Sequence, residues 1–299
     1  MIFGIIAMLL VGISWIVWGY VAGVANRRKL NMELMVACSA ALGAAVSLPI
    51  ALGKGLPDFT SPQVLVIMGW IVLGGILNFA QLQFMNRAMN FGPNGIIWSI
   101  IQMGFICPFI LGVSFFGEPL SWSFVAGVVL VIAALTIFAV AGDNTAKGKW
   151  MFFTLLSFLA TCGCQSCQYI PSNLAGVDQV PSIWRTLGFF SGLLLGFVIT
   201  ICVSGNVRKQ IVPQTRNKYT WIYSGLIVSV EVATCSLLLY PGLDAMAKAG
   251  IGAISTQLMT ASSIVAFELY AILLLREKRT VMQVIATLLC LASIAAVCF

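Results

Sequence analysis

Two acidic side chains of this 299-residue chain lie inside long apolar stretches, where an ionised group is costly. Glu231 stands between two valines near the middle of one stretch, and Glu268 lies roughly 10 Å inside another at 1.5 Å per helical residue. A carboxyl group at such depth can bind and release a proton, or it can pair with a cationic ligand. The alternatives are a neutral carboxyl that hydrogen-bonds a neighbouring helix and, for Glu268, a side chain that reaches back to the polar end of its stretch.

Amide side chains form a second candidate group, and pairs of them are spaced to share one helix face. Asn78 and Gln81 are three residues apart, and Gln165 and Gln168 repeat that spacing. Amides both donate and accept hydrogen bonds, which suits a neutral polyol or a zwitterion. Hydrogen bonding between helices is the alternative. The amide candidates for substrate contact are Asn78, Gln81, Gln102, Gln165 and Gln168.

Aromatic side chains in the same stretches form a third group. Trp15 and Trp18 are three residues apart and share a helix face. Ring faces can stack on a sugar or hold a cation, whereas many membrane aromatics simply lie at the lipid–water interface. Tyr169 and Tyr240 complete the aromatic candidates for substrate contact.

A possible gate follows from the sequence Tyr240-Pro241-Gly242. Proline and glycine are expected to break the apolar helix here, as in the discontinuous helices of transporters. Asp244 and Lys248 are four residues apart just beyond the break, so we expect them to pair with each other. The predicted pair is a candidate gate.

Three further acidic residues stand where a helix is expected to begin: Glu33, Glu118 and Glu277. The positive end of the helix dipole favours a carboxylate at such a position. We interpret these residues as helix caps or gate contacts and not as substrate ligands.

Several kinds of chemistry lack the residues they need. The chain has no histidine, which removes histidine bases, histidine-activated nucleophiles and histidine metal centres. Cys162, Cys164 and Cys167 do not place three sulfur atoms on one helix face, so we expect no metal site. The cysteines lie in apolar runs, so we expect no disulfide, and no phosphate-binding Gly-x-x-x-x-Gly-Lys-Ser/Thr loop is present. We expect no cofactor, and a membrane-embedded enzyme is the weaker alternative from another class.

The composition determines which elements must position these groups. Hydrophobic residues make up 60% of the chain and charged residues only 8%, against about a quarter charged in soluble domains. The net charge of +7 could suggest nucleic acid as a partner, but the basic residues sit in short clusters between apolar runs and form no basic stripe. The composition therefore predicts an all-α integral membrane protein that binds no nucleic acid.

Charge-free stretches of about 20 residues predict ten transmembrane helices. They must be helices, because an open strand would leave its backbone groups unsatisfied in lipid. The expected spans are Ile2–Val24, Leu34–Leu52, Val64–Asn86, Gly95–Phe116, Leu120–Ala141, Trp150–Ile170, Ile183–Ser204, Tyr219–Tyr240, Ile251–Leu275 and Val281–Phe299.

The distribution of basic residues predicts the orientation. Thirteen of the 16 Lys and Arg residues follow odd-numbered spans, and the other three are Lys54, Arg185 and Lys248. Loops rich in Lys and Arg stay in the cytoplasm. We therefore expect both termini to be non-cytoplasmic, in a bacterial inner membrane.

The two halves of the chain repeat one pattern. Residues 87–95, which begin Arg-Ala-Met, are echoed 157 residues later by residues 244–252, which begin Asp-Ala-Met. Each copy leads into an apolar span that ends at an acidic residue, Glu118 and then Glu277, 159 residues apart. We expect two five-helix repeats, residues 1–143 and 150–299, joined by a linker at 144–149. Five spans per repeat make the halves inverted, which is typical of secondary transporters.

These repeated motifs resemble the drug/metabolite transporter superfamily in its ten-helix, EamA-type form. The likeness rests on the tight turn at residues 88–95, on Glu118, on Gly127 in the following helix, and on the copies of the turn and the acidic residue in the second half. Ala286 stands where the first half has Gly127. The basic residues 27–29 followed by Glu33 resemble the sugar-uptake branches, such as rhamnose and glucose permeases, and Gln81, Gln83 and Asn86 add to that likeness.

The resemblance implies a secondary active, proton-coupled transporter of a small polar organic solute, with sugar uptake favoured. Export of amino acids, metabolites or drug-like cations is the alternative. The expected partners are a small-molecule substrate, the lipid bilayer and protons, and the expected assembly is a monomer or a homodimer.

Overall fold

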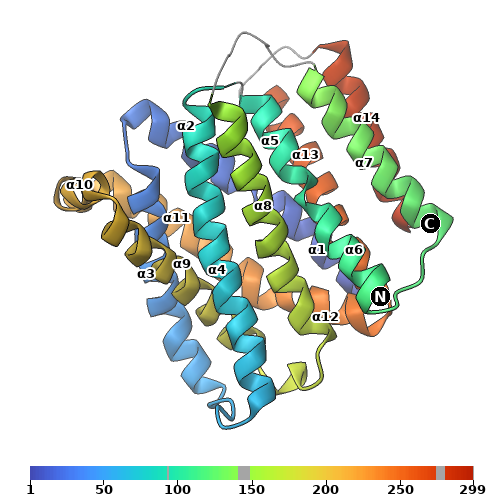
Figure 1. Cartoon of the computed structure of the whole chain (residues 1–299), viewed down its shortest axis with the longest axis horizontal. Helices are drawn as coiled ribbons and strands as arrows, with labels where there is room; N and C mark the ends of the chain where they lie inside the picture. Colours follow the sequence, from blue (N-terminus) through green and yellow to red (C-terminus); the bar gives the residue numbers. More distant parts are fainter. Residues whose placement is uncertain (93, 141–148, 274–279, 299) are drawn as a thin grey trace.

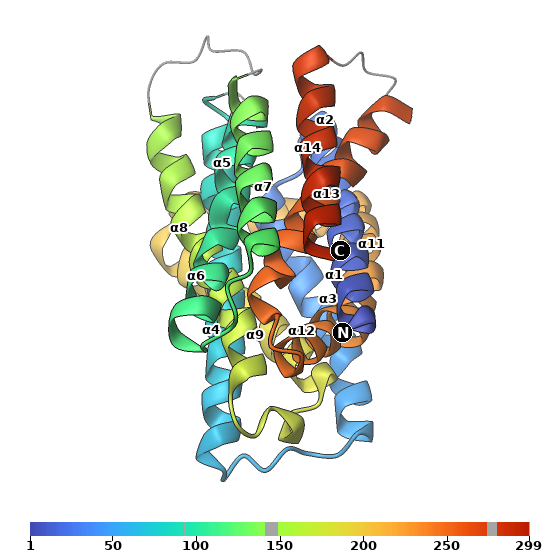
Figure 2. The ribbon, with the colours of Figure 1, turned by 90° about the vertical axis from the view of Figure 1, so that its right-hand side faces the viewer.

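The chain folds as an elongated bundle of helices standing side by side (Figures 1 and 2). The structure, a computed structural model, describes residues 1–92, 94–140, 149–273 and 280–298. Across these residues the regular structure is helical and contains no strand. The all-helical prediction is therefore confirmed. Glu277 and all of the expected linker except Lys149 lie outside the described residues.

The helices of the first half follow the predicted spans closely. They are α1 (Ile2–Ser14), α2 (Ile16–Arg28), α3 (Met32–Gly53), α4 (Pro62–Met89), α5 (Asn94–Gln102), η1 (Met103–Phe105), α6 (Ile106–Phe115) and α7 (Trp122–Val140). The first predicted span is interrupted at Trp15, whose backbone N–H bonds to the carbonyl groups of Gly12 and Ile13. Asn31 caps α3 by accepting the Leu34 N–H, and Pro62 begins α4, where its missing N–H costs nothing.

The helices of the second half begin after the expected linker. They are α8 (Trp150–Tyr169), η2 (Ile170–Asn173), η3 (Val177–Gln179), α9 (Ser182–Val203), α10 (Gly205–Thr215), α11 (Lys218–Ala233), η4 (Thr234–Leu239), α12 (Tyr240–Lys248), η5 (Gly252–Ile254), α13 (Ser255–Leu273) and α14 (Val281–Cys298). Segment α10 was expected to be a loop, because its sequence is polar and basic. It forms a helix that contacts α9, α3 and α11.

The expected break at Tyr240-Pro241-Gly242 does not occur. Residues 218–248 form one long helical run, and the six residues of η4, directly before Tyr240, are π-helical. Proline removes a backbone N–H and crowds the preceding turn. A π-helical turn shifts the hydrogen-bond register, which accommodates Pro241 without ending the run.

Within the part of the chain that the structure describes, six helical stretches are long and apolar enough to cross a membrane. They are Ile2–Val21, Met32–Gly53, Pro62–Met89, Trp150–Asn173, Ser182–Val203 and Lys218–Lys248. Shorter apolar helices occur at Ile100–Phe115, Trp122–Ile137 and Val281–Ala296. Large apolar side chains point outward from the bundle, for example Trp122, 89% exposed, and Leu273, 71% exposed. Such an outer surface fits a hydrocarbon surrounding, and the protein is integral to a membrane.

Helices from the two halves of the chain pack against one another along the bundle. α4 contacts α8 and α9, α3 contacts α9 and α11, α1 contacts α13, and α7 contacts α14. α4 and α9 approach closely, and a Cβ built on Gly75 would lie 2.9 Å from the Cα of Gly192. Small residues allow such close packing of membrane helices, and here the two glycines let the backbones nearly touch.

The two ends of the bundle, lower and upper in Figure 1, carry different numbers of basic residues. The lower end carries the connections 54–61 and 170–181 and the C-terminal end of α12, and its basic residues are Lys54, Arg185 and Lys248. The upper end carries the connections 29–31 and 90–92 and the helix α10. Its described basic residues include Arg28, Lys29, Arg87, Arg208, Lys209, Arg216 and Lys218.

Candidate functional site

Glu231 and Trp18 meet in the interior of the bundle. Trp18 lies on α2, Glu231 lies near the end of α11, and both side chains are half-buried. The Trp18 indole Nε1–H donates a hydrogen bond to Glu231 Oε1. Among the described residues, no cation forms an ion pair with Glu231. The carboxyl group therefore has a neutral donor as its partner, so a proton or a cationic group remains free to bind it.

Trp15 lies one turn before Trp18, at the interruption between α1 and α2. Both rings pack against the largest hydrophobic cluster, which includes Phe79, Cys164 and Tyr240. The spacing of the two tryptophans therefore predicted a shared environment, and only Trp18 forms a side-chain bond to the carboxyl group.

The two amides of α4 face each other, as their spacing predicted. Asn78 Nδ2 donates to Gln81 Oε1 over 3.3 Å, and both side chains are half-buried. The backbone carbonyl of Gln81 accepts the Ser157 hydroxyl at 2.9 Å, which ties α4 to α8. Each amide keeps further donors and acceptors beyond this one bond, so the pair can hydrogen-bond a polar ligand.

Two of the other three amides lie on α8 and the third lies at the end of α5. Gln165 is 7% exposed on α8, and its Oε1 is buried without a hydrogen-bond partner in the described part of the chain. Gln168 is half-buried on the side of α8 that approaches Gly74 of α4. Gln102 is 4% exposed at the junction of α5 and η1.

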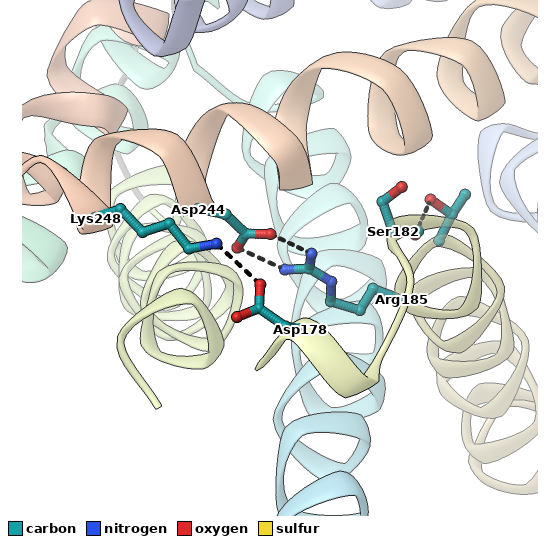
Figure 3. Close-up of polar contacts among 6 residues, drawn as sticks. Asp178, Ser182, Arg185, Asp244 and Lys248 are labelled. Carbon is teal, nitrogen blue, oxygen red and sulfur yellow. Dashed lines mark hydrogen bonds and ion pairs between the residues drawn. The ribbon is translucent and has the colours of Figure 1, made fainter. Parts of the chain in front are cut away.

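Asp244 forms a buried ion pair at the lower end of the bundle (Figure 3). Arg185, the fourth residue of α9, donates from Nη1 to Asp244 Oδ1 over 2.9 Å and from Nη2 to Oδ2 over 2.5 Å. The Arg185 side chain is only 3% exposed, and its Cζ lies 5.0 Å from the centre of the Tyr240 ring. Tyr240 is fully buried, and its hydroxyl has no hydrogen-bond partner among the described residues.

The expected pairing of Asp244 with Lys248 was therefore wrong. Lys248 Nζ instead donates to Asp178 Oδ1 of η3 at 2.9 Å, and both side chains are exposed (Figure 3). Spacing on one helix predicted that the two side chains share a face. It could not reveal that α9 and η3 each bring a charged residue to α12. A bidentate arginine holds a carboxylate better than a lysine can, which explains why Asp244 pairs with Arg185.

Tyr169 is engaged in a separate contact between the halves. Its hydroxyl donates to Glu118 Oε1 at 2.5 Å, and Glu118 Oε2 accepts the Ala253 backbone N–H at 2.7 Å. Glu118 was expected to cap the helix that follows it. It instead precedes α7 by several residues and caps η5, at the start of the α13 run. The prediction named the correct type of contact but the wrong helix, because the partner lies 135 residues away.

Glu268 lies on α13 and is half-buried. The helix α13 packs against α1 and α14, and the neighbouring Phe267 ring lies 5.6 Å from the Trp98 ring. The site thus contains one acidic candidate on α11 with a described indole partner and a second acidic candidate on α13.

A polar pocket of about 460 Å³ opens at the upper end. Side chains from the α2–α3 turn, the end of α4 and α10 surround it. Its lining residues are Lys29, Leu30, Asn31, Met32, Glu33, Asn86, Arg87, Asn90, Ser204, Val207, Gln210 and Gln214. A smaller neighbouring pocket shares Glu33, Asn86 and Asn90 and continues inward to Phe79. The bundle is therefore indented from the upper end towards its core.

Sequence reasoning overlooked Arg185 and Asp178. Arg185 entered only the count of basic residues, and the signal that could have identified it is its position one turn inside an apolar span. The cysteines do not change this description of the site. Among the residues that the structure describes, no group of three or more His, Cys, Asp or Glu residues is arranged to hold a metal ion.

The fold and the site define an α-helical membrane protein with a polar interior. Residues 2–140 match the EamA-like transporter family. This match suggests a membrane transporter of the drug/metabolite type, in line with the resemblance of the repeated motifs. Members of this family are transporters and not enzymes.

Among solved structures, one titled only "Crystal structure of protein" shares the fold. It aligns with a TM-score of 0.67 at 17% sequence identity, over 97% of this chain and 95% of the other. No curated protein sequence matches the chain.

Proposed function

We propose that the protein is a proton-coupled secondary carrier of a small polar organic solute, with sugar uptake as the favoured activity. The observation that carries the proposal is the contact between Glu231 and Trp18 inside the bundle. Trp18 comes from the first half of the chain and Glu231 from the second. A carboxyl group at the junction of two moving halves can change its protonation as access changes from one side to the other.

We further propose that ten spans form two inverted repeats, residues 1–143 and 150–299. Helix contacts that come in matching pairs support this arrangement. α4 packs on α8 as η4 and α12 pack on α1, and α4 packs on α9 as α11 packs on α3. Likewise α1 contacts α13, and α8 contacts α5 and α6. In the proposed repeat, spans one to five correspond to spans six to ten. Each of these contacts then has an equivalent contact between the corresponding spans, which is expected of a duplicated unit.

The solute class follows from the residues near the core. The Asn78–Gln81 pair offers amide donors and acceptors, and Trp15 and Trp18 offer ring faces. This combination suits a sugar-like solute. A specific observation favours the alternative, export of a cationic or zwitterionic metabolite: Glu231 has no cation of its own in the described residues. The distribution of basic residues supports an inner-membrane orientation with the upper end in the cytoplasm and the termini outside it.

Proteoliposomes containing a trapped pH-sensitive dye test the proposal. Pools of sugars, amino acids, nucleosides and quaternary amines are added in turn to the wild type, Glu231→Gln and Glu268→Gln. We expect one pool to drive proton flux in the wild type and in Glu268→Gln, and the flux to vanish in Glu231→Gln.

The alternative outcomes are distinct. Solute entry that is equal in all three proteins and moves no protons would contradict proton coupling and leave a facilitator or an exchanger. Loss of flux in Glu268→Gln alone would move the coupling site to α13. A response only to quaternary amines or amino acids would replace the sugar with the alternative solute class.

A further inference from the structure

Repeat symmetry relates two pairs of charged residues at opposite ends of the bundle. Asp244 occupies the position of Arg87, because Asp-Ala-Met repeats Arg-Ala-Met 157 residues later. Arg185 lies in the first turn of α9, and Glu33 lies in the first turn of α3, a helix of the same 22-residue length. Each half of the chain therefore carries one charge at a helix start and an opposite charge near the end of the next membrane-length helical run. The signs are reversed between the halves.

The pair in the second half is closed. Arg185 clasps Asp244 with both terminal nitrogens at the lower end, and Asp178 and Lys248 form a second, exposed pair beside it (Figure 3). Met246, two residues after Asp244 on α12, packs against α1 at Gly4. The lower end is thus tied together across α9, α12 and α1.

The pair in the first half is open. Glu33 and Arg87 are half-buried and line the same 460 Å³ pocket at the upper end. They form no ion pair with each other, since the ion pairs among the described residues are Arg185–Asp244 and Asp178–Lys248. In this structure the two charges at the lower end form an ion pair, whereas the two charges at the upper end are not paired with each other and line a pocket.

We propose that Glu33 and Arg87 form the counterpart of the Arg185–Asp244 gate, and that only one of the two ion pairs exists at a time. The inference rests on the proposed carrier function and adds the residues that alternate. When the lower pair separates, the upper pocket closes as Glu33 approaches Arg87. Exchanging one pair for the other keeps one ion pair in each state, so that the loss of one contact is offset by the formation of the other.

Helix dipoles explain why the lower pair is the closed one in this structure. Glu33 at the start of α3 and Arg87 at the end of α4 each face the dipole end of opposite sign, so each charge is tolerated alone. Arg185 at the start of α9 and Asp244 towards the end of α12 each face the dipole end of the same sign. Those two charges depend on each other, which favours closure at the lower end when no solute is bound.

Hydrogen–deuterium exchange of the protein in lipid nanodiscs, without any solute, tests the proposal. The reporter amides are residues 170–181 and 249–254 at the lower end, and residues 29–34 and 86–92 at the upper end. In Asp244→Asn we expect exchange to become about tenfold faster at the lower end and slower by a similar factor at the upper end. Asp178→Asn, which removes only the exposed pair, is the matched control and is expected to leave both ends as in the wild type.

A second variant isolates the upper pair. In the double variant that combines Arg87→Gln with Asp244→Asn, we expect amide exchange at the lower end to stay fast. The slower exchange that Asp244→Asn alone causes at the upper end should disappear. Equal protection with and without Arg87 would overturn the proposal, as would faster exchange at the lower end with no change at the upper end. If Asp244→Asn does not fold, Arg185→Gln with Asp244→Asn removes both charges and gives the same comparison.

The exchange experiment does not depend on transport. Reciprocal protection in a protein that carries none of the tested solutes would support the gate and contradict the carrier assignment. Proton-coupled flux in a protein that lacks reciprocal protection would support the carrier and overturn the gate.

Discussion

Two carboxyl groups in one helical run, Glu231 and Asp244, are held in opposite ways. Glu231 accepts a hydrogen bond from a neutral indole, whereas Asp244 receives two bonds from the guanidinium of Arg185. A bidentate guanidinium supplies a counter-charge and fixes the orientation of a carboxylate. A single neutral donor orients the carboxyl group but supplies no counter-charge. Glu231 and Asp244 are thirteen positions apart on one helical run. The first is suited to exchanging a proton or a cation, and the second joins two helices.

The largest effect on stability is expected when Asp244 loses its cation. Arg185→Ala leaves a carboxylate inside the bundle without its partner and should lower the free energy of unfolding by about 3–5 kcal/mol. Arg185→Lys keeps the charge but loses the two-bond geometry, so its loss should be smaller. Denaturant unfolding in detergent micelles measures both. Equal losses for Ala and Lys would show that geometry, and not charge, stabilises the lower end.

A smaller effect is expected at Glu231. Trp18→Phe keeps an aromatic ring in the core but removes the indole donor, which should cost about 1–2 kcal/mol in the same unfolding measurement. Solute-driven proton flux should fall as well, because the carboxyl group is no longer oriented. If flux stayed at the wild-type level while stability fell, the bond would serve packing alone, and the contrast with Asp244 would weaken.

The smallest effect is expected at the exposed ion pair. Asp178→Asn removes the partner of Lys248, but both side chains lie in water, where an ion pair contributes little. The unfolding midpoint should match that of the wild type at low and at high salt. A clear loss of stability would mean that the two lower pairs act as one unit.

The positions of the helices could be predicted from the sequence because lipid permits few alternatives. Apolar length sets each span, and the described helices begin and end within a few residues of most expected boundaries, with the eighth span continuing to Lys248. The exceptions have local causes. Pro241 is absorbed by a π-helical turn, and α10 is too polar to be recognised from hydropathy.

The candidate site could be predicted only where its residues are close in sequence. Asn78 and Gln81 share a face, and the spacing of three residues is sufficient to say so. Partners of Asp244 and Glu118 come from helices far along the chain, and no spacing rule carries that information. For the same reason, counting basic residues did not predict which of them forms an ion pair with Asp244. Such a count does not distinguish a lysine in a loop from a buried arginine.

The glycine crossing of α4 and α9 has a mechanical consequence. Gly75 is the fourteenth of the 28 residues of α4, and Gly192 is the eleventh of the 22 residues of α9. The point of nearest approach therefore divides both helices in half, as the fulcrum divides a balance beam. Each arm of α4 is about 21 Å long at 1.5 Å per residue, so a tilt of about 10° would move its two tips by about 4 Å in opposite directions. A motion that narrows one mouth of the protein would widen the other by the same amount.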